Sequence, residues 1–224
     1  MNDTQSQPAL SWRAGIFAAL ALVMIATRSS LLRDHLFPLP DASWPVFFVA
    51  GFYFSSGNRE RLYGLFSRSL AMGSFVLLMA LAVLIDYVVI SAQGIGFWQH
   101  YCVSPAYWFL LPSYAALWIG GAFLRAHYRG LHARELGLLA ASALVAASVC
   151  YLISNGSFYW LSNSWLSASV PARSFGGWLE NLGDWYRPFM QTTLAYVAVA
   201  AVIHVLAVQM LRFMPAHDGG KQRR

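Results

Sequence analysis

The chain has 224 residues, of which 58% are hydrophobic and only 11% are charged, whereas about a quarter of the residues of a soluble domain are charged. A mean hydropathy of +0.51 and 16% aromatic residues exclude a disordered chain. The net charge of +6 does not indicate nucleic acid as a partner, because in a membrane protein the positions of the basic residues matter more than their sum. The composition predicts an all-α polytopic protein of the lipid bilayer, with one domain over residues 1–224.

Six apolar runs predict six membrane-spanning helices. They lie at about residues 12–27, 43–55, 67–92, 104–124, 136–156 and 187–213. The second run is short for a bilayer and requires either a thinned membrane or support from neighbouring helices. The stretch between the last two runs, from Ser157 to Tyr186, is expected to be a long outer loop.

The basic residues support six spans. With a cytoplasmic N-terminus, eleven Lys and Arg residues fall in the inner segments, and only Arg28, Arg33, Arg173 and Arg187 fall in the outer ones. Removing the second span would scramble this division. The positive-inside rule therefore predicts that both termini are cytoplasmic.

Tryptophan is concentrated at the predicted outer ends of the helices. These residues are Trp44, Trp98, Trp108, Trp160, Trp165, Trp178 and Trp185. A bilayer belt would place tryptophan at both faces. The one-sided excess indicates either an aromatic-walled basin that opens outward or a surface flap anchored by its tryptophans.

The segment before the fourth run, GFWQHYCVSPAYWFLLPSY, contains the most reactive side chain types of the chain. Pro105 suits the first turn of a helix, which would place Cys102 just before a helix N-terminus. The helix dipole favours the thiolate form at such a position. His100, Tyr101 and Tyr107 lie close by in the sequence. The alternative interpretation is that Cys102 is a buried and inert small residue.

Two aspartates at the outer ends are candidates for a site. Asp86 lies about two turns from the outer end of the third run, an expensive position that indicates either function or pairing with Arg28 or Arg187. Asp41 precedes the second run and is expected to cap that helix, with hydrogen bonding to a ligand as the alternative.

Two further residues lie inside apolar runs and are expected to be structural. Cys150 has only apolar neighbours, which keep a thiol inert. His204 is expected to be a core histidine bonded to a neighbouring helix. The sequence contains no P-loop, GxSxG or HExxH motif.

Four segments, TRSSLL, LPDASWPVFFVAGFYF, YCVSPAYWFLLPSY and LISNGSFYW, resemble the solitary vitamin B12 transport proteins of Gram-negative bacteria. These are the BtuM-like S components of the energy-coupling factor (ECF) class, and the resemblance covers about residues 12–213. It implies a six-helix bundle in the bacterial inner membrane that binds cobalamin in a cavity open to the periplasm. It also implies that Cys102 ligates the corrin cobalt, with His100 as the alternative ligand.

A corrin is broad, apolar on its faces and fringed with amides, so aromatic walls with scattered donors and acceptors suit it. The candidate contacts besides Cys102 are Tyr101, Tyr107, Asp41, Trp44, Asp86 and Tyr159. The resemblance implies a transporter rather than an enzyme, in a solitary mode without an ECF ATPase module. The alternative function is a membrane enzyme that uses the thiol of Cys102 with His100 or Asp86 as its base.

Overall fold

The computed structural model describes residues 7–29, 39–55, 64–100, 102–162 and 173–213. Within these ranges all regular elements are helices and no strand is present. The α-helices are α1 (Gln7–Arg28), α3 (Ser43–Phe54), α4 (Gly64–Ala92), α5 (Leu110–His127), α6 (Ala133–Leu161) and α7 (Phe175–Phe213), and two short 3-10 helices, η2 (Phe97–Gln99) and η3 (Pro105–Phe109), precede α5. The all-α fold is confirmed for the described residues.

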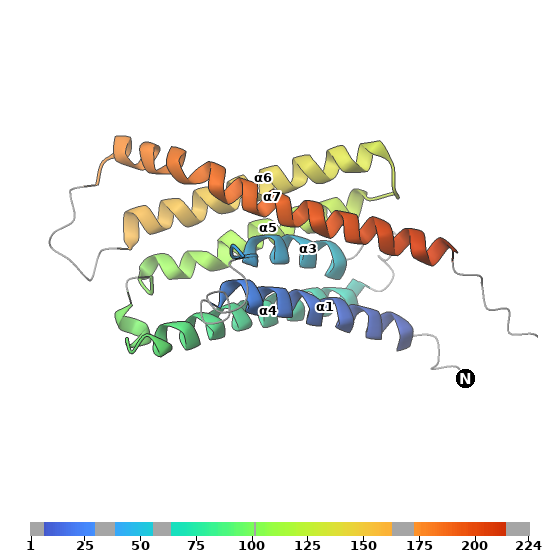
Figure 1. Cartoon of the computed structure of the whole chain (residues 1–224), viewed down its shortest axis with the longest axis horizontal. Coiled ribbons are helices and arrows are strands. Elements are labelled where there is room, and N and C mark those ends of the chain that lie inside the picture. Colours follow the sequence, from blue (N-terminus) through green and yellow to red (C-terminus); the bar gives the residue numbers. More distant parts are fainter. Residues whose placement is uncertain (1–6, 30–38, 56–63, 101, 163–172, 214–224) are drawn as a thin grey trace, which may run out of the picture.

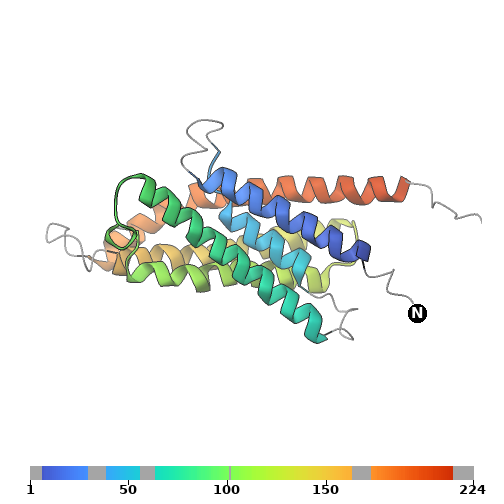
Figure 2. The same ribbon diagram turned by 90° about the horizontal axis from the view of Figure 1, so that it is seen from below.

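The helices form an elongated bundle in which α1 begins and α7 ends at the same end (Figure 1). We call this the Phe213 end. We call the opposite half of the bundle, in which α1 finishes, the Arg28 end. Figure 2 shows the C-terminal half of α7 along one edge of the bundle. Five helical segments are long and apolar enough to cross a membrane, which indicates a multi-pass membrane protein.

The second predicted span, which is not among these five, corresponds to α3, which has only 12 residues. A helix of that length measures about 18 Å, whereas the hydrocarbon core is about 30 Å thick. A complete crossing by α3 therefore stays a prediction.

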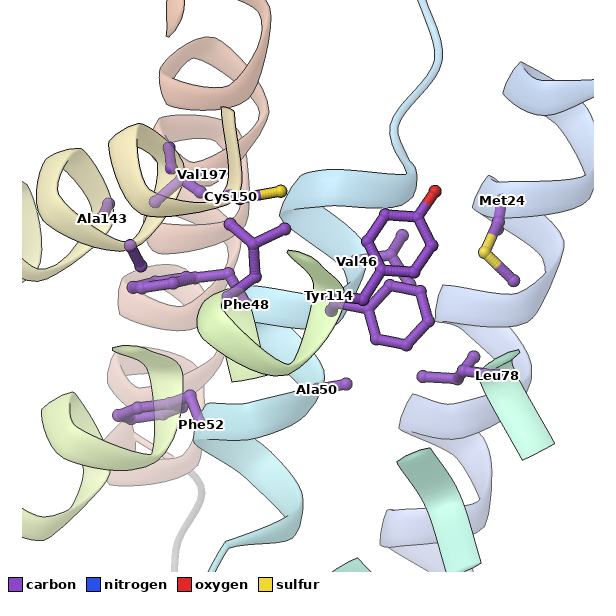
Figure 3. Packing of buried hydrophobic residues seen from close by; sticks show 14 of the residues in the cluster. Met24, Val46, Phe48, Ala50, Phe52, Leu78, Tyr114, Ala143, Cys150 and Val197 are labelled. Atoms are coloured by element: carbon purple, nitrogen blue, oxygen red, sulfur yellow. The ribbon is translucent and has the colours of Figure 1, made fainter. Parts of the chain in front are cut away.

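Despite its shortness, α3 is the centre of the hydrophobic core. Nine of its 12 residues are buried, and it packs against α1, α4, α5 and α7. In Figure 3, Val46 and Ala50 lie toward Met24 of α1. Phe48 points to the opposite side, toward α6 and α7. A helix that is apolar on all sides is expected to be enclosed in this way.

Two glycines bring α3 and α5 into backbone contact. A Cβ at Gly51 would overlap the backbone carbonyl of Trp118, and a Cβ at Gly121 would overlap that of Phe48. Small residues at facing positions permit this close approach in helix pairs of membrane proteins. The rotation of α3 against α5 is therefore fixed by the two glycines.

The sequence predicts a long outer loop from Ser157 to Tyr186. This prediction is wrong for the part of the segment that the structure describes, because that part is mostly helical. Helix α6 continues to Leu161, and α7 begins at Phe175 and contains Pro188. Glu180 and Asp184 interrupt the apolar pattern that marks a span, but both are exposed on α7. Polar residues on an exposed face do not end a helix, so the helix starts before the apolar run begins.

Candidate functional site at the Arg28 end

An ion pair between Arg28 and Asp86 forms the centre of the site. Nε and Nη2 of Arg28 donate to the two carboxylate oxygens of Asp86, each at 2.7 Å. The two side chains are only 13% and 19% exposed. Two parallel short bonds are the geometry that makes arginine–carboxylate pairs strong. The pairing of Asp86 with Arg28, one of its two expected roles, is confirmed.

The third nitrogen of Arg28 connects further helices to this pair. Its Nη1 donates to Tyr114 Oη at 2.9 Å, to Ser43 Oγ at 3.0 Å and to Asp41 Oδ2 at 3.2 Å. The hydroxyl of Ser43 in turn donates to Asp41 Oδ1 at 2.6 Å. One guanidinium at the end of α1 thus joins α3, α4 and α5.

The N-cap position of α3 is occupied by Ala42, one residue later than the sequence predicts, and Asp41 supplies a side-chain acceptor at the helix start. Its Oδ1 accepts the backbone N–H of Ser43 at 2.9 Å. The preceding N–H, that of Ala42, donates to Thr27 Oγ1 at 3.0 Å. Backbone donors at a helix start need such partners. The position of Asp41 against Arg28 is therefore set by the same contacts that begin α3.

A cavity of about 300 Å³ opens beside the ion pair. Its polar lining residues are Arg28, Asp86, Gln93, His100, Cys102, Tyr107, Ser154 and Ser157. Tyr107 Oη donates to Asp86 Oδ2 at 2.9 Å, which ties the wall of the cavity to the ion pair. The structure brings together four of the residues singled out in the sequence: Cys102, His100, Asp86 and Tyr107.

Cys102 lies in the segment that leads into η3. Pro105 lies in the first turn of η3, as expected, so Cys102 does precede a helix N-terminus. That helix is a short 3-10 helix, and α5 begins only at Leu110. Pro112 has no N–H to donate to residue 108, so the α-helix begins where this proline falls in the first turn. The N–H of Cys102 donates to Nδ1 of His100 at 3.3 Å. The Cys102 side chain is partly exposed.

The other predicted contacts lie elsewhere or outside the described residues. Trp44 stacks on Phe189 with ring centroids 5.0 Å apart. Tyr159 donates to the carbonyl of Ser174 at 3.1 Å. Neither lines the cavity. Tyr101 lies outside the described residues.

The aromatic lining of this cavity consists of Tyr107 and Phe158, and no tryptophan is among its described lining residues. Trp98 and Trp108 are 78% and 76% exposed. Exposed tryptophans at the end of a membrane bundle are typical of interfacial anchors. Trp165 lies outside the described residues.

Tyr114 is the main member of the network that the sequence interpretation missed. It is buried at 2% exposure and stacks on Phe47 with ring centroids 4.4 Å apart. A signal was available, because Tyr107 and Tyr114 are seven positions apart, which places residues of a continuous helix on one face.

No known protein family model matches the chain, and no curated protein matches it either.

Proposed function

We propose that the protein binds a corrinoid, cobalamin, at the Arg28 end and mediates its uptake across the bacterial inner membrane. The observation that carries the proposal is a partly exposed thiol, Cys102, on the wall of a cavity that also contains hydrogen-bonding groups. A thiolate is a soft ligand that suits cobalt. Gln93, Tyr107 and Ser157 provide donors and acceptors for the amides at the rim of the corrin.

The protein supplies one axial ligand to a metal that the corrin already holds. Among the described residues no group of three His, Cys, Asp or Glu side chains could hold a metal ion. A corrin provides four equatorial nitrogens, so a single protein sulfur is sufficient. A cavity of about 300 Å³ is at the lower limit for ligand sites. It accommodates the axial face around the cobalt, and the rest of the macrocycle lies over the end of the bundle.

Cys102 is favoured over His100 as that ligand. Because Nδ1 of His100 accepts the N–H of Cys102, its lone pair is engaged and the proton of the neutral ring is on Nε2. Ligation through either nitrogen would require loss of this bond or a change of tautomer. Ligation through the sulfur of Cys102 leaves the tautomer of His100 unchanged.

The competing function, a thiol enzyme, requires a base for Cys102. Asp86 is poorly suited to that role, because its two oxygens already accept bonds from Arg28 and Tyr107. His100 Nδ1 already accepts the backbone N–H of Cys102. These bonds favour the binding function.

The test is the absorption spectrum of purified protein mixed with hydroxocobalamin. We expect a spectral change on binding that is lost in Cys102→Ala and retained in Cys150→Ala, the matched control at a buried thiol. An unaltered spectrum in the Cys102 variant with corrinoid still bound would refute ligation. Absence of corrinoid binding by the unchanged protein would refute the proposed function and favour the thiol enzyme.

Transport is tested separately in proteoliposomes that contain this chain alone. Uptake of labelled cobalamin without an added ATPase would support the solitary mode. We propose that both termini lie on the cytoplasmic side. Uptake only after addition of an ECF ATPase module would refute it.

A further inference from the structure

A second cavity, of about 380 Å³, lies at the Phe213 end, between α3, α5, α6 and α7. In Figure 1, α6 and α7 cross near their middles and diverge toward this end. The walls are mainly apolar and include Phe48, Phe52, Leu139 and Val197. Leu136 also lines the cavity and is 61% exposed. The cavity therefore reaches the apolar outer surface of the bundle, where lipid chains lie against a membrane protein.

The polar group His204 on the wall of this cavity is already satisfied. Its Nδ1 is 2.7 Å from Tyr53 Oη, and its Nε2 is 3.1 Å from Tyr128 Oη. A neutral imidazole has one donor and one acceptor nitrogen, and both have partners here. The expectation of a core histidine bonded to neighbouring elements is confirmed, and His204 has no need of a ligand.

Glu135 is different. It lies in the first turn of α6, lines the cavity and is only 8% exposed. Its Oε2 is buried and has no hydrogen-bond partner. Nδ1 of the exposed His132 is 3.7 Å from Oε2, within ion-pair distance when the imidazole is protonated but beyond hydrogen-bond distance. An unbonded buried carboxylate oxygen is costly, so this atom points to a ligand with an N–H donor.

Three arginines lie near Glu135 in the sequence, at the same end of the bundle. Arg129 and Arg134 are exposed, and each lies between two residues that line the cavity. Arg125, also at this end, has its guanidinium 5.6 Å from the ring centroid of Phe52. The site thus combines a buried acceptor for an ammonium, exposed cations for a phosphate and an apolar cavity for a chain.

We propose that this cavity binds an aminophospholipid of the adjacent membrane leaflet, phosphatidylethanolamine. Its ammonium donates to Glu135, its phosphate lies near Arg129 and Arg134, and one acyl chain enters the cavity between α6 and α7. Phosphatidylcholine has the same charges but no N–H donor. Phosphatidylglycerol has the phosphate but no cation. The buried carboxylate therefore selects the ethanolamine headgroup.

The experiment measures lipid binding by native mass spectrometry on delipidated protein in detergent. Phosphatidylethanolamine, phosphatidylcholine and phosphatidylglycerol with identical chains are titrated in parallel. We expect phosphatidylethanolamine to bind about tenfold more tightly than phosphatidylcholine, the ratio that one charge-assisted hydrogen bond provides. Equal affinities, or tighter binding of phosphatidylglycerol, would overturn the proposal.

Glu135→Gln should abolish this preference, and Glu180→Gln, at an exposed acid of α7, is the matched control that should retain it. A preference that survives in Glu135→Gln would also overturn the proposal. The lipid-free melting temperature of Glu135→Gln reports whether the variant is folded, because the change preserves the size of the side chain. If that variant does not fold, a series of phosphatidylethanolamines with one, two or three N-methyl groups is titrated into the unchanged protein. Their affinity should fall when the last N–H of the headgroup is replaced.

Discussion

The two carboxylates that contact Arg28 allow a direct test of how burial controls the strength of an ion pair. Asp86 is 19% exposed and accepts two bonds of 2.7 Å. Asp41 is 42% exposed and lies 3.2 Å from the same guanidinium. Replacing each aspartate by asparagine removes one charge and preserves the size of the side chain. We expect Asp86→Asn to be the far more destabilising of the two.

The magnitude follows from the contacts that remain. Breaking a buried ion pair by removal of one partner costs about 3–5 kcal/mol. Arg28 keeps its bonds to Asp41, Ser43 and Tyr114, so the lower limit of about 3 kcal/mol applies to Asp86→Asn. An exposed pair contributes about 0–1 kcal/mol, so Asp41→Asn should cost at most about 1 kcal/mol.

Thermal unfolding in detergent is the assay. One kcal/mol corresponds to a shift of about 2–4 °C for a chain of this length. The melting temperature should fall by about 6–12 °C for Asp86→Asn and by about 2–4 °C or less for Asp41→Asn. Equal falls would refute the burial argument, and an unchanged melting temperature for Asp86→Asn would refute the strength assigned to the ion pair. Corrinoid binding should also be weakened in Asp86→Asn.

Three further predictions concern the thiols, the helix packing and the topology. Maleimide should label Cys102 in the folded protein, whereas Cys150, at 0% exposure, should react only after unfolding; equal labelling rates would contradict the burial of Cys150. Gly121→Ala should separate α3 from α5 and cost about 1–3 kcal/mol, measured by thermal unfolding, and unchanged stability would contradict the backbone contact. Reporter fusions at Gly94 and Arg129 should report opposite sides of the membrane, and a common side would contradict the arrangement of α5 as a span.

The helices were predictable because membrane insertion selects long apolar runs, and five of the runs lie in helices that can cross a membrane. The start of α7 was not predictable, because the first part of this helix contains the exposed Glu180 and Asp184 and lacks the apolar pattern that marks a span. A helix boundary that lies on a polar face leaves little signal in hydropathy alone.

The sequence allowed several residues of the site to be predicted, but not which of them are bonded to each other. An aspartate inside an apolar run requires a partner, and Arg28 was among the candidates. Choosing between candidates required the fold, since Arg28 and Asp86 are 58 positions apart. Trp44 is only three positions from Asp41, yet the rotation of α3 turns it onto Phe189 and away from the cavity. Side-chain direction depends on helix packing, which no local pattern specifies.

The shortness of α3 bears on how the protein is assembled during synthesis. Its first residues are held by Thr27 and Arg28 of α1, and its middle is held by α5 through Gly51. A segment of 12 residues is too short for independent insertion by the translocon. We expect α3 to wait at the membrane surface until α5 has been synthesised. A nascent chain that ends before α5 should therefore leave a cysteine introduced at Val49 open to a water-soluble reagent, and a chain that includes α5 should protect it.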